Sequence, residues 1–477
     1  MTPAARPTPR RLGILSTQAA SLGLSCVALT TIQGCDFIPL LSRVSKPNNC
    51  PVLTSPAAAY KNYQTTLERL RLARTLQPGD KAFCLLPQNV EATRDPKRTY
   101  KDIITHHFDP DILYAALSEG FDAIIRKDQE LGLKRRAQIA WKGVWLSEAS
   151  LAAYRRTGQE RFLDLFSNYY DAIIERRDDK LNRVDAWHHR VMKAWGSTNL
   201  TEDDQALSHD KRWISHITHN ARIVLPGTDF ALIVERSPAL SRFKPKAKLY
   251  TQIAEETLNE FASDQRSVPG HPGMTWYYRP FQNKYEPTNH IHMVARAWSN
   301  LAQLTHNQDY ATRVHKVLRI FEKGVRQEPR QLISWNYYPF FVSKKEQQDY
   351  ANGQGYSEPI WKATHTTQLL LQSYQQNNDP PANTVRTIAR ILSEHTFQGD
   401  QIMRNVAEKE SKALDPKKDQ QDPNIVTLIS FATIEPKLKT QIPYVVASRP
   451  DIFPNGWLYP EGLVAYANLL PSAHNKP

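Results

Sequence analysis

Apolar residues recur at helical spacing through most of the chain after residue 109. Leu113 and Leu117 share one helix face, and the same spacing continues almost without a break to about residue 392. The pattern predicts helices over 138–154 and 162–174, separated by a turn in which Gly158 is typical of a helix end. Two apolar helices joined by so short a turn form a helical hairpin.

The hairpin pattern recurs three times further along the chain. Each copy has two apolar stripes and a polar connection between them. The expected helix pairs are 216–234 with 246–261, 292–304 with 314–321, and 361–374 with 385–392. Strand signals are sparse between these pairs and consist mainly of 331–334 and 444–447.

A helical hairpin of this kind cannot bury its apolar face alone, so neighbouring hairpins must pack in a ring or in an open array. The repeat is irregular and its loops are long, whereas an open solenoid has a shorter and stricter period. The pattern therefore favours an all-α fold, an incomplete (α/α) toroid of helical hairpins with long aromatic-rich loops and few short strands. We expect this toroid domain to span 105–477, with 397–422 as a solvated excursion.

The first 34 residues have the order of a secretory signal. Three arginines precede a mostly apolar run over 12–32, which ends at Gln33-Gly34-Cys35. This end resembles a bacterial lipobox, and the resemblance implies a lipid on Cys35 and a place on a periplasm-facing or outer-surface bacterial membrane. Polar residues dilute the apolar run, so simple secretion or a weak membrane anchor is the alternative.

The four cysteines agree with export. Cys26 lies within the expected signal and Cys35 at its end, which leaves Cys50 and Cys84 in the tether and lead-in over 35–104. In an oxidising compartment these two can form one disulfide, and two separate buried thiols are the alternative. Neither the number nor the spacing of the cysteines suggests a zinc or iron–sulfur site, and we expect no metal and no cofactor.

The chain is basic, with 61 lysines and arginines against 48 acids and a formal net charge of +13. A polyanionic partner such as nucleic acid, anionic lipid or acidic polysaccharide suits such a surface. The basic residues are scattered rather than gathered in a stripe, so we expect no nucleic-acid partner. A solvated surface is the alternative, and the oligomeric state is left open.

Three loops share a Trp-x-Tyr pattern. The first leads from 273–280 into a predicted helix after Glu286, the second leads from 335–339 toward Glu358, and the third lies at 457–460. Aromatic rings stack on sugar rings and also pack between helices, so both roles stay open. The substrate-binding candidates are Trp276, Asn289, Trp335, Tyr337, Glu358, His365, Trp457 and Tyr459.

Three local features join the hairpin order in a resemblance to the toroid-domain polysaccharide lyases, the group that contains alginate, glucuronan and heparinoid lyases. These features are Ala194-Trp195-Gly196-Ser197, His219-Asn220-Ala221-Arg222, and Trp276-x-Tyr278-Arg279 followed by Tyr285-Glu286 and a histidine. The resemblance covers about 105–470. It implies an exported enzyme that cleaves an acidic, uronate-containing polysaccharide by β-elimination.

Such a reaction needs a base for the hydrogen at C5 of the uronate, and donors that stabilise the charge developing beside its carboxylate. In the enzymes that this chain resembles, the base is often a tyrosine. A neighbouring guanidinium would lower the pKa of that tyrosine toward a useful range. The catalytic candidates are Tyr285, Tyr278, Arg279, His290, Asn220 and His219.

Plainer roles compete for several of these residues. Glu286-Pro287 and Glu358-Pro359 fit helix starts, where an acid meets the positive end of the helix dipole, and we expect capping for both. His290 and His292 do not share a helix face, so a metal site there is disfavoured.

Two other functions stay open. An inverting glycoside hydrolase on the same toroid would use two carboxylates, drawn from Asp185, Asp229, Glu286 or Glu358. A non-catalytic lipoprotein that binds a glycan, or that assembles with an export machine, would keep the aromatic and basic residues without an activated tyrosine.

Overall fold

The computed structural model describes residues 110–132, 137–198, 212–279, 282–343, 357–376, 382–399, 401–405, 413, 423–448 and 460–470. All of them belong to the second of two compact units, which spans Ile38–Pro477. The expected signal, Cys35, the pair Cys50 and Cys84, and the third aromatic loop with Trp457 and Tyr459 lie outside the described residues.

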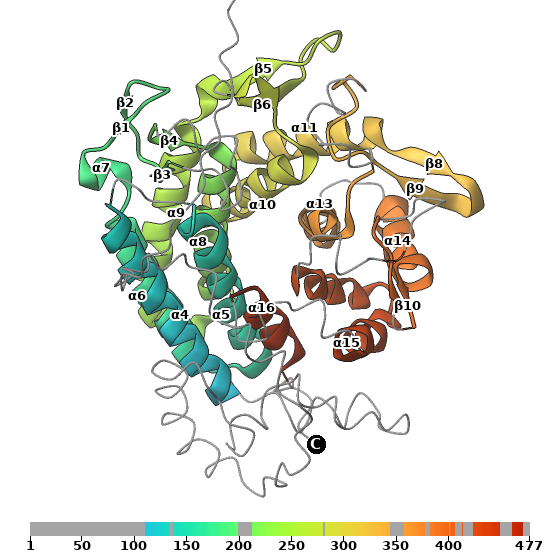
Figure 1. The fold of residues 1–477 in the computed structure, drawn as a ribbon, viewed down its shortest axis with the longest axis horizontal. Helices are drawn as coiled ribbons and strands as arrows, with labels where there is room; N and C mark the ends of the chain where they lie inside the picture. Colours follow the sequence, from blue (N-terminus) through green and yellow to red (C-terminus); the bar gives the residue numbers. More distant parts are fainter. Residues whose placement is uncertain are drawn as a thin grey trace, which may run out of the picture. The chain divides into compact units, whose positions relative to one another are not determined.

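Helices dominate the described residues, and the strands among them are short (Figure 1). The α-helices are α4 (Pro110–Leu131), α5 (Val144–Thr157), α6 (Arg161–Ile174), α7 (Asp178–Leu181), α8 (Ile217–Glu235), α9 (Lys244–Asn259), α10 (Thr288–Thr305), α11 (Gln308–Gly324), α13 (Ile360–Gln375), α14 (Ala382–Ile391), α15 (Leu438–Ser448) and α16 (Pro460–Leu469). The π-helical turns are η4 (Ile139–Gly143) and η9 (Leu392–Thr396). The 3-10 turns are η5 (Pro238–Phe243), η6 (Ala262–Asp264), η8 (Pro329–Gln331) and η10 (Pro423–Thr433). The predicted mostly helical fold with few short strands is confirmed.

All strand pairs are antiparallel. They are β1 (Val184–Asp185) with β2 (Arg190–Val191), β3 (Gly196–Ser197) with β4 (Ile214–Ser215), β8 (Arg326–Glu328) with β9 (Leu332–Ser334), and β10 (Phe397–Gln398) with β11 (Gln401–Ile402). A three-stranded sheet joins β5 (Gln265–Ser267), β6 (Thr275–Arg279) and β7 (Lys284–Tyr285) in that order. This sheet leads directly into α10, so its register decides which side chains reach the start of that helix.

The predicted hairpins are present as α5 with α6, α8 with α9, α10 with α11, and α13 with α14. Gly158 ends α5 with φ of 68°, and its N–H donates to the Tyr154 carbonyl, so the expected glycine stop is confirmed. The strand expected at 444–447 is wrong, because these residues lie in α15. Leu438, Ile442 and Val445 are buried at helical spacing, which stabilises a helix there despite the β-branched run.

The first helix of each hairpin packs against the first helix of the next. α5 contacts α8, α8 contacts α10, and α10 contacts α13; the contacts then pass through η10 and α16 and reach α5 again. A helix that is packed by neighbours on several sides is expected to be buried around its whole circumference, with apolar side chains or with polar side chains that are hydrogen-bonded. In α8 every residue from Ile217 to Thr228 is buried, whereas in α11 only one stripe is buried.

Candidate functional site

Buried polar residues gather where α8 and α10 begin. Glu286, His216 and Thr218 have side chains that are almost wholly buried, and Arg279 and His290 are about one-eighth exposed. Buried polar groups cost free energy unless they are paired, so the partners of these side chains define what the cluster can do. We call these five residues the Glu286 cluster.

The carboxylate of Glu286 lies at the centre of this cluster and accepts five hydrogen bonds. Oε1 lies 2.5 Å from His216 Nε2 and 2.7 Å from Arg279 Nε, while Oε2 lies 2.8 Å from Arg279 Nη2, 2.8 Å from His290 Nδ1 and 3.1 Å from Thr218 Oγ1. Burial by itself raises the pKa of Glu286, but Arg279 and then His216 outweigh it and hold the pKa well below its usual value. The group is therefore an anion that fixes its neighbours in place.

The expected capping role of Glu286 is wrong. The N-cap of α10 is Pro287, and no side chain caps it. The same holds for Glu358: Pro359 is the N-cap of α13, and the Glu358 carboxyl instead accepts from Trp335 Nε1 at 2.5 Å and Thr366 Oγ1 at 3.0 Å. Burial raises the pKa of Glu358 to about 8.

The tautomer of His290 follows from the crowding at Glu286 Oε2. His290 Nδ1 lies 2.8 Å from both Oε2 and Arg279 Nη2. The guanidinium can only donate, and the carboxylate can only accept. If His290 Nδ1 carries the hydrogen, it and Arg279 Nη2 both donate to Glu286 Oε2. In the opposite tautomer the lone pair of Nδ1 would face the lone pairs of the carboxylate, which is repulsive. We therefore assign the hydrogen to Nδ1. Burial lowers the pKa of His290 to about 3, so the ring is neutral and its Nε2 is an acceptor.

His219 has the opposite tautomer. Trp141, in the π-helical turn η4, donates from its indole Nε1 to His219 Nε2 at 3.3 Å, so Nδ1 carries the hydrogen. Burial, and then the neighbouring His216, lower the pKa of His219 well below its usual value. The His216 and His219 rings lie 5.0 Å apart. The site thus contains three imidazoles whose pKa values are lowered, and two of them have assigned tautomers: His290 with an acceptor at Nε2 and His219 with a donor at Nδ1.

The strand register separates Tyr278 and Tyr285 from the guanidinium. Tyr278 pairs with Tyr285 and Arg279 pairs with Lys284, so the two tyrosines share one face of the hairpin and Arg279 points to the other. The two phenol rings lie 5.1 Å apart, and Tyr285 also packs edge-on against Phe341 at 5.1 Å. The expected pairing of either tyrosine with Arg279 is therefore not formed.

Two other tyrosines, Tyr338 and then Tyr337, help to raise the pKa of Arg279. Tyr337 accepts from the backbone N–H of Thr288 through its carbonyl at 2.9 Å, which fixes the second aromatic loop to the first turn of α10. Burial raises the pKa of Tyr337, and Arg279 acts in the opposite direction. Lys362 Nζ, from the first turn of α13, lies 4.0 Å from the centre of the Tyr337 ring. Burial lowers the pKa of Lys362 to about 8.

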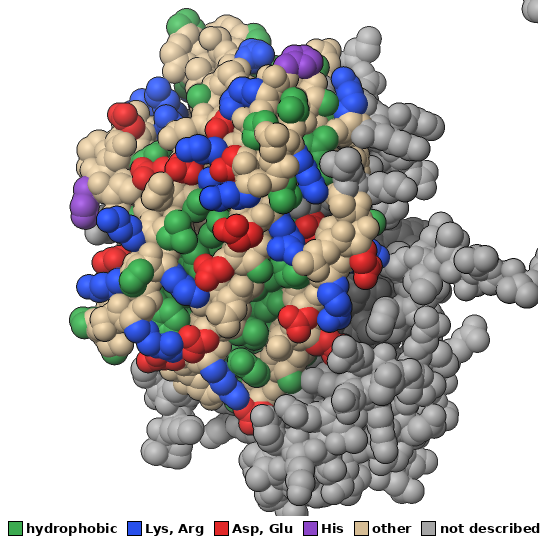
Figure 2. Space-filling view, turned by 90° about the vertical axis from the view of Figure 1, so that its left-hand side faces the viewer, with side chains coloured by type: hydrophobic (Ala, Val, Ile, Leu, Met, Phe, Trp, Pro, Cys, Tyr) green, Lys and Arg blue, Asp and Glu red, His purple; other side chains and the backbone are tan. Residues whose placement is uncertain are grey.

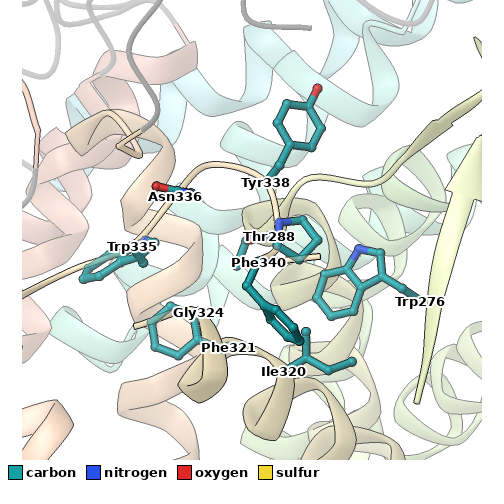
Figure 3. A pocket seen from close by; sticks show the side chains of 10 residues that line it. Trp276, Thr288, Ile320, Phe321, Gly324, Trp335, Asn336, Tyr338 and Phe340 are labelled. Atoms are coloured by element: carbon teal, nitrogen blue, oxygen red, sulfur yellow. The ribbon is translucent and has the colours of Figure 1, made fainter. Parts of the chain in front are cut away.

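The two predicted tryptophans lie beside this cluster rather than in it. Trp276 and Trp335 are 1% and 3% exposed, and Trp276 Nε1 donates to the Glu286 carbonyl at 2.7 Å. Both line a largely apolar hollow of about 290 Å³, open solvent included, between the start of α10 and the end of α11 (Figure 3). The hydroxyl of Tyr338 points away from this hollow. The first two aromatic loops thus converge as expected, but around the hollow and not around Glu286.

Of the other predicted site residues, Asn220 and His365 have structural partners, whereas the buried side-chain oxygen of Asn289 has no hydrogen-bond partner. Asn220 is fully buried; it accepts from the Trp195 N–H at 2.8 Å and donates to the His216 carbonyl at 2.9 Å. Asn289 is 4% exposed. His365 lies one layer deeper, where Arg222 Nη1 is 3.1 Å from its Nε2, and burial followed by Arg222 holds its pKa well below the usual value.

Sequence reasoning missed four members of this site: His216, Thr218, Trp141 and Lys362. The spacing His216-x-Thr218-His219 at a helix start was a usable signal, because it brings three polar side chains to one turn. Lys362 had a weaker signal, three residues before His365 on the same helix.

Comparison with known proteins gives no relative: no family model, no curated protein and no solved structure matches this chain. Within the described ranges no helix is long and apolar enough to cross a membrane. The described histidines, cysteines and acids include no group of three arranged to hold a metal ion.

Proposed function

We propose that the chain is an exported lyase that cleaves an acidic, uronate-containing polysaccharide by β-elimination, on an (α/α) toroid. The cyclic order of helix contacts from α5 through α8, α10 and α13 and back through α16 supports the toroid. The Glu286 cluster lies at the starts of α8 and α10, and Lys362, in contact with the Tyr337 ring, lies at the start of α13, so the starts of three first helices carry the proposed site.

The observation that carries the proposal is the proximity of Lys362 to Tyr337 next to Arg279. An elimination needs a base that is partly unprotonated and an acid that is still protonated at the working pH. Lys362, with its pKa lowered to about 8, suits the base, and Tyr337, with its pKa raised by burial, suits the acid. This assignment replaces Tyr285 and Tyr278, which lie on the other face of the β6–β7 hairpin.

The proposed reaction is balanced by these two groups. The Lys362 amine takes the hydrogen at C5, and the electron pair of that bond forms the C4–C5 double bond. The bond from C4 to the glycosidic oxygen breaks, and the Tyr337 hydroxyl gives its proton to that oxygen. A proton then returns from the Lys362 ammonium to the phenolate, whose ring lies 4.0 Å from Nζ.

Glu286 already neutralises the charge of Arg279. The uronate carboxylate would therefore be stabilised by hydrogen-bond donors and not by an unpaired cation. The Nδ1–H of His219 and the remaining hydrogens of Arg279 supply such donors in a buried setting, where fixed dipoles are most effective. His290 Nε2 offers an acceptor for a sugar hydroxyl.

A glycoside hydrolase is less well supported by the same carboxylates. Its general acid must carry a proton and its general base must be free to bind water. Glu286 is held ionised by five hydrogen bonds, and Asp185 accepts from the backbone N–H groups of Trp187, His188 and Ser215. Neither has a free oxygen to bind water as the general base. Glu358, with its pKa raised to about 8, meets the requirement for the general acid but still needs such a base.

The test is incubation of the full chain with a panel of uronate polymers while the ultraviolet absorbance of an unsaturated product is followed. Tyr337→Phe and Lys362→Met should each lower the rate by about 10²–10⁴-fold, the usual contribution of a positioned acid or base. Tyr285→Phe is the matched control and should keep most of the activity. Reducing ends without unsaturation would replace the lyase with a hydrolase, and no product from any polymer would favour binding alone.

Export and lipid attachment at Cys35 are proposed from the N-terminal sequence, and they place the enzyme on a periplasm-facing or outer-surface bacterial membrane. Incorporation of a labelled fatty acid into the wild type and its loss in Cys35→Ser would support the anchor. Equal labelling of both proteins would exclude it.

A further inference from the structure

Exposed large hydrophobic side chains are concentrated in one short segment. Among the described residues five are exposed: Leu181 (38%), Val184 (57%), Trp187 (37%), Leu249 (42%) and Tyr444 (54%). The first three lie within seven consecutive residues, from the end of α7 through β1 to the turn that follows. Single exposed hydrophobics need no explanation, but three in one segment indicate a surface that is covered in use.

Basic side chains accompany these three. Lys180 is exposed and Arg183 is half-buried, and Arg190 and Lys193 are exposed but form ion pairs with Glu260 and Glu256. We refer to residues 180–193 as the Trp187 hairpin. The carboxylate of this segment, Asp185, is fully buried. The face of the molecule that carries α7 and the β1–β2 pair, seen in Figure 2, shows lysine and arginine side chains interspersed with acidic and hydrophobic ones.

The Trp187 hairpin is firmly held, so its exposed side chains are presented in a fixed arrangement. Asp185 Oδ1 accepts from the N–H of Trp187 at 2.9 Å and of His188 at 2.7 Å. The His188 ring bridges Asp185 Oδ1 at 2.9 Å and Asp264 Oδ1 at 3.1 Å, which joins the hairpin to η6. Rigid support of this kind is what a contact surface requires, since little ordering is left to be done on binding.

We propose that the Trp187 hairpin docks on an anionic lipid surface. Tryptophan and leucine favour the boundary between headgroups and acyl chains, and lysine and arginine are attracted to anionic headgroups. The hairpin supplies both kinds of side chain in one segment, and the chain as a whole carries a formal charge of +13. An acidic polymer would use the basic residues but leave Leu181 and Val184 in water, so lipid accounts for more of the surface. The proposal does not depend on lyase activity.

The experiment measures binding of the full chain to vesicles by co-sedimentation, with Cys35→Ala throughout so that the proposed lipid cannot contribute. Vesicles that contain phosphatidylglycerol are compared with vesicles of phosphatidylcholine alone. The triple variant Leu181→Ala/Val184→Ala/Trp187→Ala removes the apolar contacts, and Leu249→Ala/Tyr444→Ala removes the exposed hydrophobics elsewhere as the matched control. Unchanged far-ultraviolet circular dichroism and thermal unfolding establish that each variant is folded.

We expect the triple variant to bind anionic vesicles on the order of tenfold more weakly, which corresponds to about 1.4 kcal/mol, and the control variant to bind as the parent does. Lys180→Gln should weaken binding to anionic vesicles only, and added salt should act in the same direction. Brominated lipid should quench the tryptophan fluorescence of the parent more than that of Trp187→Phe.

Three outcomes would overturn the proposal. Equal binding of parent and triple variant would exclude the hairpin as the contact. Equal binding to both kinds of vesicle would exclude recognition of lipid charge. Loss of binding to a uronate polymer in the triple variant, with vesicle binding retained, would make this surface a glycan contact.

Discussion

Replacement of Glu286 by glutamine removes one negative charge from the Glu286 cluster and leaves the shape almost unchanged. The carboxylate accepts two hydrogen bonds at Oε1 and three at Oε2. A glutamine offers one oxygen and one NH₂ group, so at least two of the five buried donors lose their acceptor. Each buried donor left unpaired costs about 1–3 kcal/mol, and the loss of one partner from a buried ion pair costs about 3–5 kcal/mol.

We therefore expect Glu286→Gln to lower the free energy of unfolding by about 3–5 kcal/mol at neutral pH, measured by urea titration. Glu358→Gln is the matched control, because Glu358 is equally buried but its pKa is raised to about 8. At pH 6 that group is already neutral, so its glutamine variant should cost no more than about 1 kcal/mol. Similar costs for the two variants would refute the assignment of Glu286 as a buried, paired anion.

The pH dependence of the Glu286→Gln effect has a definite sign. The folded-state pKa of Glu286 lies well below its usual value, so the unfolded chain binds the proton more readily than the folded chain does. Its contribution is complete above the unfolded pKa of about 4.3 and is lost as the pH falls below that value. The difference between wild type and Glu286→Gln should therefore narrow in acid. If the difference in the free energy of unfolding between wild type and Glu286→Gln did not change with pH, the variant would have lost packing and not a charge interaction.

Three further predictions concern His188, Lys362 and Gly196. Burial lowers the pKa of His188, but Asp185 and then Asp264 outweigh it and raise the pKa to about 9. The stability lost in His188→Gln should therefore be largest below pH 6.5 and disappear as the pH rises through about 9. Urea unfolding at several pH values measures this loss. If Lys362 is the base, the rate of product formation should rise with pH up to about 8 and then level off. The rate of Lys362→Met should no longer rise in this pH range. A rise that persists in the variant would exclude Lys362 as the base. A Cβ on Gly196 would lie 2.1 Å from Trp213 Nε1, so Gly196→Ala should lower the free energy of unfolding by about 1–3 kcal/mol. Gly270→Ala is the control: the turn is open and φ is 70°, so the substitution should cost only about 1 kcal/mol of backbone strain.

The helices were predictable from sequence because their apolar faces recur within each segment. The hairpins of α5 with α6 and of α10 with α11 follow from spacing alone. The same local reasoning failed at Glu286. An acid before a proline at a helix start has the local features of a cap, and the partners that give it another role are Arg279, seven residues earlier, and His216, seventy residues earlier. Pairing over that distance is not encoded in any local pattern.

The tyrosines show a second limit. Trp276 to Arg279 alternate in strand fashion, but the choice of face depends on the register, which places Tyr278 opposite Tyr285 and turns both away from Arg279. Sequence reasoning expected Tyr278 or Tyr285 to lie beside Arg279, whereas the register puts both tyrosines on the other face of the hairpin. Lys362 was missed because its lowered pKa arises from burial on α13, which no single residue pattern reports.

The proposed binding of a polyanion does not require the Glu286 cluster to be strongly cationic itself. Arg279 is neutralised by Glu286, and burial keeps His219 and His290 uncharged. The two fixed tautomers then supply a donor at His219 Nδ1 and an acceptor at His290 Nε2, each set by a partner outside the ring, Trp141 in one case and Glu286 in the other. Such a site recognises a carboxylate and a hydroxyl by direction rather than by net charge. In the proposed reaction, the positive charge that attracts a polyanion would then come from the basic surface around the site, and Lys362 and Tyr337 would transfer the protons.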